Sequence, residues 1–360
     1  MISKEFYKNL NEVCEERGLQ KEDLYEIVRR AFVYAFKKTF GNESCKVVLN
    51  PDKQEINLYK VERVVDTLSQ TPPEDGISEI LVEDARKLKG KSNAKVGQII
   101  ETPVSMAELG RPGANMMKST FNQSLKQLER EKAEAYFKNL EGEMIKAKVV
   151  EVKDDYLILD IGRNITTYLP KKELLVNDNP IEGEYLRVFI RKVEHTNKDP
   201  KVFVSRNDKG LIKRLLETYI PEIADGAIEV KGLARDPGDR TKVAVASNDP
   251  NIDPVGACVG ENGSRAREIV DALNGEKVEF YAYSDNIEET IANSLKPATV
   301  SKVLNVDPKT KTSVAIVPDD QLSLAIGKAG QNVRLAVQSC GWKIDIKTFQ
   351  QALEEDLILN

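Results

Sequence analysis

Apolar residues recur every three or four positions near the start of the chain. One run covers residues 6–13 and a second covers residues 24–36, while Gly18 and Gly41 interrupt the pattern. This spacing is typical of amphipathic helices, and glycines commonly end them, so we expect two helices. Residues 45–65 instead alternate between apolar and polar around a Pro-Asp turn, which predicts a β-hairpin.

The next part of the chain mixes turn signals with helix formers. Residues 68–95 hold a proline pair and a polar run, so we expect irregular structure there with one short helix at residues 82–88. Residues 114–140 contain neither proline nor glycine, and apolar side chains repeat within them at helical spacing. They predict a long connecting helix. We expect it to start after Pro112-Gly113, because proline disfavours a helix interior.

A series of short strands follows. After Gly142, apolar and polar residues alternate in five runs with turn signals between them. Five short strands so close together are typical of a small barrel of the OB type. The runs are residues 145–152, 156–161, 165–169, 186–193 and 202–204.

The remainder of the chain contains an internal repeat, which weighs most in the interpretation. Each copy is expected to form a helix, two strands, a short helix, a Gly-x-x-Gly tetrad, a helix and a strand. The tetrads start at Gly260 and Gly327, an offset of 67 residues (327 minus 260). The elements expected around them are residues 211–220, 228–234, 242–246, a helix from 254, and 278–283, then 287–295, 300–306, 313–317, 320–326, 332–340 and 342–346.

Composition narrows the class of protein. The formal net charge of −5 argues against coating duplex nucleic acid by charge alone, so any nucleic-acid contact must be local. One histidine, His195, and four scattered cysteines argue against a zinc site, a multi-histidine metal centre or a disulfide framework. The sequence lacks a run of apolar residues that could span a bilayer, and its start lacks a secretory pattern. We expect a cytoplasmic protein without membrane contact, metal or cofactor.

The two glycine tetrads carry the candidate chemistry. In the KH fold a Gly-x-x-Gly turn joins two helices and clamps the backbone of about four unpaired nucleotides. Glycine lets phosphate oxygens approach backbone amides, and the start of the following helix favours anions. In the second loop Lys328 can neutralise a phosphate, and Arg334 lies on the following helix. Gln331 and Asn332 can bond base edges or stabilise the helix start.

The first loop is less basic than the second. Glu261 stands where the second loop has Lys328, so we expect weaker phosphate binding there, with Arg265 and Arg267 supplying the positive charge. Apolar side chains beside the loops are expected to take splayed bases as well as fill the core, namely Val259, Ile269, Ile326 and Val333. The candidate RNA-binding residues are Gly260, Glu261, Asn262, Gly263, Ser264, Arg265, Arg267, Gly327, Lys328, Ala329, Gly330, Gln331, Asn332 and Arg334.

A simpler interpretation is that Gly-x-x-Gly only makes a tight turn between two helices. Short motifs often occur by accident, and one copy would favour this interpretation. Two copies in matching helix and strand contexts instead favour RNA binding.

Two blocks of sequence resemble the NusA family of bacterial transcription termination and antitermination factors. Residues 236–245 (DPGDRTKVAV) with residues 253–260 (DPVGACVG) are similar to the family's first KH signature. Residues 325–336 (AIGKAGQNVRLA) with residues 341–346 (GWKIDI) are similar to the second. The order of the modules also resembles that of the family, so the resemblance covers nearly the whole chain.

The resemblance implies an α+β multidomain protein and a set of functions. It implies a non-enzymatic, monomeric factor that binds RNA polymerase and single-stranded nascent RNA, with possible contacts to other Nus factors. Through this binding the factor would modulate pausing, termination and antitermination. The implied modules are an N-terminal α/β polymerase-binding domain (1–120), a linker helix (121–141), an S1-motif OB-fold barrel (142–206), a first and a second type II KH domain (207–284 and 285–348) and a C-terminal tail (349–360). Many relatives continue with further helical repeats, so regulation through such an extension is expected to be absent.

Five further residues are possible RNA or polymerase contacts. Arg111 and Lys118 match basic positions of the family, although a solvated helix face explains them equally well. An S1-motif barrel usually offers aromatic side chains on its binding face, and here the candidates are Tyr156, Tyr168 and Phe189. Each aromatic residue fits the core or plain surface equally well.

Two other classes of protein remain open. Exoribonucleases also carry KH and S1-motif domains, but with the KH domain before the barrel, and residues 1–140 show no carboxylate cluster at metal-site spacing. A ribosome-associated RNA-binding protein is the second alternative, because tandem KH modules do not specify which RNA is bound. The partner of residues 1–120, RNA polymerase or the small ribosomal subunit, distinguishes the transcription factor from the ribosome-associated protein. Nuclease activity with magnesium would favour the exoribonuclease.

Overall fold

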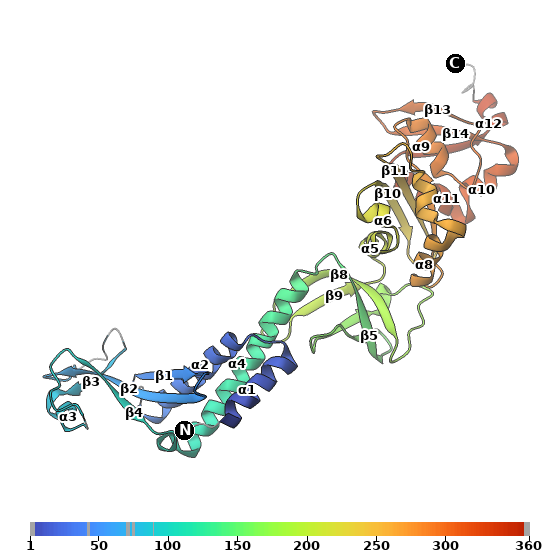
Figure 1. Cartoon of the computed structure of the whole chain (residues 1–360). Helices are drawn as coiled ribbons and strands as arrows, with labels where there is room; N and C mark the ends of the chain where they lie inside the picture. The colour runs from blue at the N-terminus through green and yellow to red at the C-terminus, as the bar shows by residue number, and fades with distance from the viewer. Residues whose placement is uncertain (1–3, 42–43, 70–72, 74–75, 89, 356–360) are drawn as a thin grey trace. The chain divides into compact units, whose positions relative to one another are not determined.

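The computed structural model describes residues 4–41, 44–69, 73, 76–88 and 90–355. The chain divides into two compact units, Met1–Lys132 and Ala133–Asn360, which are described separately (Figure 1). Residues 70–72, 74–75 and 89 of the stretch expected to be irregular lie outside the described residues, as do residues 356–360 of the expected tail.

The first unit packs three helices against a four-stranded sheet. In the sheet β2 pairs with β1 and β4 antiparallel and with β3 parallel. Tyr7, Phe32 and Leu125 bring α1, α2 and α4 into one core with the sheet, and these helices lie side by side in Figure 1. The elements are α1 (Lys4–Arg17), α2 (Lys21–Thr39), β1 (Cys45–Asn50), β2 (Glu55–Val65), β3 (Ser78–Leu81), α3 (Val82–Lys87), β4 (Ile99–Val104), η1 (Met106–Leu109) and α4 (Gly110–Lys138).

The sequence predicted the helices and the hairpin of this unit but not all of its strands. Strand β3 lies within the stretch expected to be irregular, and β4 was not predicted. Strand β3 forms because β2 is long enough to pair beyond the end of β1, and β4 pairs along the opposite edge of β2. Pro103 lies in β4, which pairs only with β2 in the described sheet, and proline is tolerated on such an edge strand.

Helix α4 starts earlier than its sequence indicated. It begins at Gly110 and therefore includes Pro112 and Gly113, so the prediction of a start after this pair was wrong. Pro112 lies in the first turn, where its missing N–H would have had no helical partner. At Gly113 a Cβ would lie 3.0 Å from the Leu109 Cβ and 3.0 Å from the Thr39 hydroxyl, so glycine allows a close approach to α2.

The second unit begins with a five-stranded antiparallel barrel. Its strand order is β7-β6-β5-β8-β9, and β7 lies next to β9, where Thr167 donates a hydrogen bond to the Val202 carbonyl. Alternate side chains fill the interior, and Phe137 from the end of α4 joins them. The strands match the predicted runs: β5 (Met144–Val152), β6 (Tyr156–Asp160), β7 (Thr166–Pro170), β8 (Tyr185–Glu194) and β9 (Lys201–Ser205), with the short η2 (Lys171–Glu173) after β7.

The predicted repeat is confirmed as two copies of one fold. In each copy the second strand pairs antiparallel with the first and parallel with the third. The first copy comprises α5 (Lys209–Tyr219), α6 (Pro221–Ala224), β10 (Ile228–Asp236), β11 (Arg240–Ser247), α7 (Pro254–Val259), η3 (Glu261–Gly263), α8 (Ser264–Ala272) and β12 (Lys277–Ala282). The second comprises α9 (Ile287–Ser294), β13 (Lys302–Asp307), β14 (Thr312–Val317), η4 (Asp319–Gln321), α10 (Leu322–Ile326), η5 (Lys328–Gly330), α11 (Gln331–Cys340), β15 (Lys343–Thr348) and α12 (Phe349–Glu354). The α+β multidomain class is therefore confirmed.

Candidate nucleic-acid interface

The two glycine loops have the same backbone conformation. Gly260 and Gly327 both have φ 76° and ψ 171°, and Gly263 and Gly330 are both left-handed. A Cβ at Gly327 would lie 2.7 Å from the Cβ of Asn332, so only glycine fits there. Each loop therefore presents the start of the following helix in the same way, which is the geometry that suits an anionic backbone.

In the second loop the Lys328 amino group is open to solvent, whereas the Asn332 side-chain amide is bonded within the protein. Lys328 is exposed, and its amino group has no ion-pair partner within the part of the chain that the structure describes. Asn332 is buried, and its Nδ2 donates to the carbonyls of Leu295 at 2.9 Å and Ala325 at 3.0 Å. The Asn332 side chain therefore braces the loop instead of facing a base, whereas Lys328 is available to a phosphate.

Gln331 and Arg334 are held by carboxylates of the first KH copy. The Gln331 Nε2 donates to Asp236 Oδ2 at 3.0 Å and to Asp239 Oδ2 at 2.6 Å. Arg334 forms an ion pair with Asp236. The sequence placed both residues in the RNA-binding set, but their acidic partners lie more than 90 positions earlier and were not predicted.

The first loop carries less free positive charge than its arginines suggested. Arg265 is half-buried, and its Nη1 donates to Glu222 at 2.7 Å and to the Ala257 carbonyl at 2.7 Å. Arg267 is exposed and donates to the Asn262 carbonyl at 3.2 Å. Glu261, Asn262 and Ser264 of this loop are exposed and place no further cation at the helix start.

A cleft of about 630 Å³ begins beside the first loop. Val259, directly before Gly260, lines it together with the edge strand β12 and residues of the segment 292–300, which connects α9 and β13 of the second copy. Lys242 also lines it at 1% exposure, with its Nζ 2.6 Å from the Lys296 carbonyl and 3.0 Å from Glu279. Burial lowers the pKa of Lys242, although Glu279 acts in the opposite direction. In the sequence this lysine is distinguished only by lying next to the apolar residues 243–246 of β11.

The four apolar candidates beside the loops do not lie on one surface. Ile269 is fully buried in the core of the first copy, so its prediction as part of a base-binding groove was wrong. Val259 and Val333 are half-buried, and Ile326 is exposed. Packing of α8 against the sheet takes Ile269 out of reach, since it faces the interior.

The barrel brings together two of its three aromatic candidates. Tyr156 and Tyr168 lie on the outer face of β6 and β7 with ring centroids 5.3 Å apart, and Tyr168 is 61% exposed. Phe189 lies apart from them, because its ring covers Gly210 of α5 so closely that a Cβ there would lie 2.2 Å away. Tyr185, which the sequence did not single out, is exposed with the Lys146 Nζ 4.9 Å from its ring centre.

The two basic candidates of α4 are both exposed. Lys118 lines an apolar cleft of about 360 Å³ together with Phe6, Phe32 and Met117, and Arg111 does not. The cleft lies between α1, α2 and α4, which the sequence could not reveal because its walls come from three separate helices.

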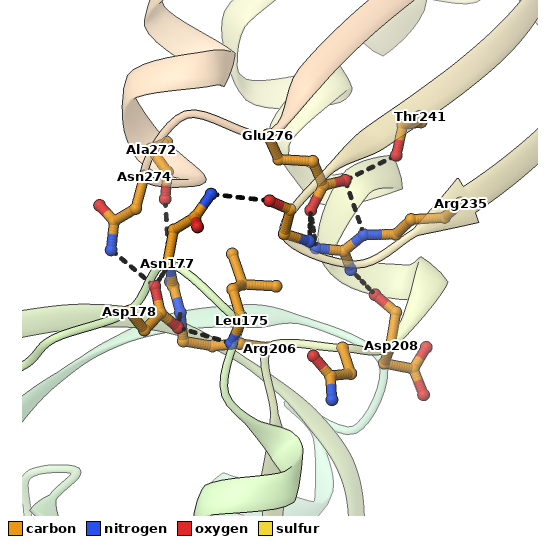
Figure 2. A network of polar contacts seen from close by, with 12 residues as sticks. Leu175, Asn177, Asp178, Arg206, Asp208, Arg235, Thr241, Ala272, Asn274 and Glu276 are labelled. Atoms are coloured by element: carbon orange, nitrogen blue, oxygen red, sulfur yellow. Dashed lines mark hydrogen bonds and ion pairs between the residues drawn. The ribbon is translucent and has the colours of Figure 1, made fainter. Parts of the chain in front are cut away.

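Two buried ion pairs lie where the barrel meets the first KH copy, and hydrogen bonds from their surroundings join the two modules (Figure 2). Arg206, which follows β9, donates to both carboxylate oxygens of Asp178 through its Nε and Nη2, and Asp178 also accepts from Asn274 at 2.6 Å. Arg235 binds Glu276 through two hydrogen bonds of 2.9 and 2.8 Å. The glycine loops and the barrel face with Tyr156 and Tyr168 thus lie on modules that hydrogen bonds hold together.

Two further properties bear on the class of protein. Among the residues that the structure describes, His, Cys, Asp and Glu side chains form no group that could hold a metal ion. No described helix is both long enough and apolar enough to cross a membrane.

The fold and the two loops define a tandem KH protein with an OB-type barrel and an N-terminal α/β domain. Family models agree: residues 5–131 match the NusA N-terminal domain, residues 206–283 the NusA-like first KH domain and residues 287–354 the NusA-like second KH domain. The chain is 36% identical to the transcription termination/antitermination protein NusA of Halalkalibacterium halodurans, over 99% of this chain and 91% of that protein. It is 36% identical to the NusA protein of Bacillus subtilis, over 98% and 93%, and 33% identical to that of Thermus thermophilus, over 99% and 92%.

The chain belongs to the NusA family. It is a transcription termination/antitermination factor, and this family consists of non-enzymatic proteins. The resemblance inferred from the two KH signatures is therefore confirmed.

Proposed function

We propose that the chain binds RNA polymerase through residues 1–120 and single-stranded nascent RNA through its two KH loops. The observation that carries the proposal is the identical conformation of the two loops, with the exposed Lys328 in the second. A phosphate at the start of α11 would meet backbone amides, the positive end of the helix and the Lys328 amino group together. Through these contacts the chain would modulate pausing, termination and antitermination, as a monomer in the cytoplasm.

Other surfaces support the same division of roles. Tyr156 and Tyr168 offer a stacking surface on the barrel, and base stacking on aromatic rings stabilises single strands without reading their sequence. The apolar cleft with Lys118 at its wall, and Arg111 on the same helix, suit a protein partner. We assign this surface to RNA polymerase. Other Nus factors would bind elsewhere on the chain.

The first test uses Lys328→Glu in the full chain. Because binding to single strands releases about 0.7 counterions per phosphate contact, the slope of log K against log salt should fall by about 0.7. Lys309→Glu, in the turn between β13 and β14, makes the same change in net charge and should leave the slope unaltered. Fluorescence anisotropy with labelled single-stranded RNA measures both.

The second test uses Arg111→Glu/Lys118→Glu in a pausing assay with RNA polymerase. Both residues are exposed, so the exchange should leave the fold intact while it shortens the factor-dependent part of the pause. RNA affinity should stay unchanged. If the double variant alters the pause as much as the unchanged chain does, the assignment of this surface to RNA polymerase is rejected.

A further inference from the structure

The turn between β10 and β11 is fixed by all three modules of the second unit. The buried Gly238 donates its amide to Glu276 at 2.8 Å, and its carbonyl accepts from Asn177 of the barrel at 2.8 Å. A Cβ at Gly238 would lie 2.7 Å from the backbone nitrogen of Val176. The turn therefore cannot move far from its place beside the second KH copy.

The two carboxylates of this turn point at the start of α11. Asp236 accepts from Gln331 and pairs with Arg334, and Asp239 accepts from Gln331 at 2.6 Å. Gln331 directly follows the second glycine loop, and Arg334 lies about one turn further along the helix. Both acids belong to the first KH copy, so one copy supplies anions to the binding loop of the other.

The carboxylates of Asp236 and Asp239 lie where a phosphate at the start of α11 would also find hydrogen-bond donors. A guanidinium and a side-chain amide at a helix start are donors that bind carboxylate and phosphate oxygens alike. The Arg334 side chain is 53% exposed, so an RNA backbone on Lys328 can reach it without unfolding the loop. RNA and the acidic turn would then compete for the same donors.

We propose that Asp236 and Asp239 act as an internal competitor that lowers the RNA affinity of the second KH loop. In the RNA-free protein they hold Gln331 and Arg334, and an arriving phosphate must replace them. Arg334 then gives up a carboxylate to bind a phosphate, so its contact adds little to the RNA affinity. Lys328 gives up no carboxylate, so its contact adds its full free energy to RNA binding. This inference rests on the proposed RNA binding and concerns its regulation.

The test is a double-mutant cycle in the full chain with Asp236→Asn/Asp239→Asn and Arg334→Gln. The probe is a labelled pool of random single-stranded RNAs about 12 nucleotides long, enough for about four nucleotides at each loop. Removing the acids should tighten binding roughly three- to tenfold and steepen the salt slope by about 0.7, because Arg334 becomes free to bind a phosphate. Arg334→Gln should change the wild-type affinity by less than about twofold but remove most of the gain in the acid-free chain.

The controls separate this effect from general charge and from misfolding. Asp319→Asn/Asp320→Asn removes two acids from η4 of the second copy and should leave the salt slope unchanged. Asp239→Asn alone removes only a contact to Gln331 at an exposed position, so it should fold normally and give a smaller gain.

Two results would overturn the inference. An equal gain in both Arg334 backgrounds would show only long-range repulsion, and weaker or unchanged binding without the acids would show that the contact merely fastens the two copies. Failure of the RNA-binding proposal looks different, because Lys328→Glu would then leave the affinity unchanged.

Discussion

The buried pair between Asp178 and Arg206 should hold the barrel on the first KH copy, because Asp178 accepts from Asn274 and Arg206 donates to the Ala272 carbonyl of that copy. Asp178→Asn keeps the shape of the side chain but leaves the Arg206 cation, at 1% exposure, with only carbonyl partners such as that of Arg187 at 2.7 Å. Removing one partner of a buried ion pair costs about 3–5 kcal/mol, because the other charge stays buried without compensation. The site should therefore open about two to four orders of magnitude more often.

Hydrogen exchange at single amides measures this opening. The Leu175 amide donates to the Asp178 carboxylate at 2.9 Å, and the Gly238 amide donates to Glu276 in the neighbouring pair. Both should lose protection in Asp178→Asn, whereas Asp154→Asn, at an exposed position between β5 and β6, should not change them. A multidomain chain need not unfold in one step, so site-resolved exchange is preferable to a single melting temperature.

A second variant tests the physical cause. Asp178→Asn/Arg206→Met removes both charges, and replacing a whole buried pair costs far less than breaking it. The double variant should therefore recover much of the protection lost in the single one. A loss of less than about tenfold in Asp178→Asn, or no recovery in the double variant, would refute the assignment of this pair as the fastening between the modules.

Two further predictions concern glycine and cysteine. Gly327→Ala should destabilise the chain more than Gly330→Ala, and thermal unfolding compares the two variants. A Cβ at position 327 would lie 2.7 Å from Asn332, whereas nothing lies within 4 Å of a Cβ at position 330. At Gly330 only the left-handed backbone strain of about 1–2 kcal/mol remains. Burial raises the pKa of Cys258 from 9.0 to about 12. As the pH rises above 9, the thiol therefore ionises in the unfolded chain but stays neutral in the folded one, which lowers the free energy of unfolding. At pH 10 the free energy of unfolding should have fallen by about 1.4 kcal/mol more in the native chain than in Cys258→Ala, measured by urea titration, and equal pH profiles would contradict this.

The repeat and its glycine loops could be predicted because their signals are local. Helical spacing, strand alternation and the Gly-x-x-Gly tetrads each lie within about twenty residues, and backbone sterics act over that range. The left-handed glycines at 263 and 330 are an example, since the need for glycine arises in the loop itself. Strand β3 was missed because its partner is the far end of β2, which no local pattern reveals.

The parts of the site that escaped prediction are those made by distant residues. Gln331 and Arg334 looked free in the sequence, but their anions lie on a turn in another KH copy. Phe189 was a candidate for the binding face of the barrel that fitted the core equally well, and only the packing of α5 shows that its ring covers Gly210. Charge and aromaticity indicate what a side chain can do, whereas tertiary contacts decide whether it is available.

The β10–β11 turn also limits how this chain can change in length. Surface turns usually tolerate insertions and deletions, since their backbones face water. Here Gly238 is buried, with its amide and carbonyl both bonded and the Val176 backbone too close for a side chain. One added residue would shift both aspartates relative to α11 and break the contact with the barrel. The β10–β11 turn is therefore constrained like a core segment, and length variation in this protein family should avoid it.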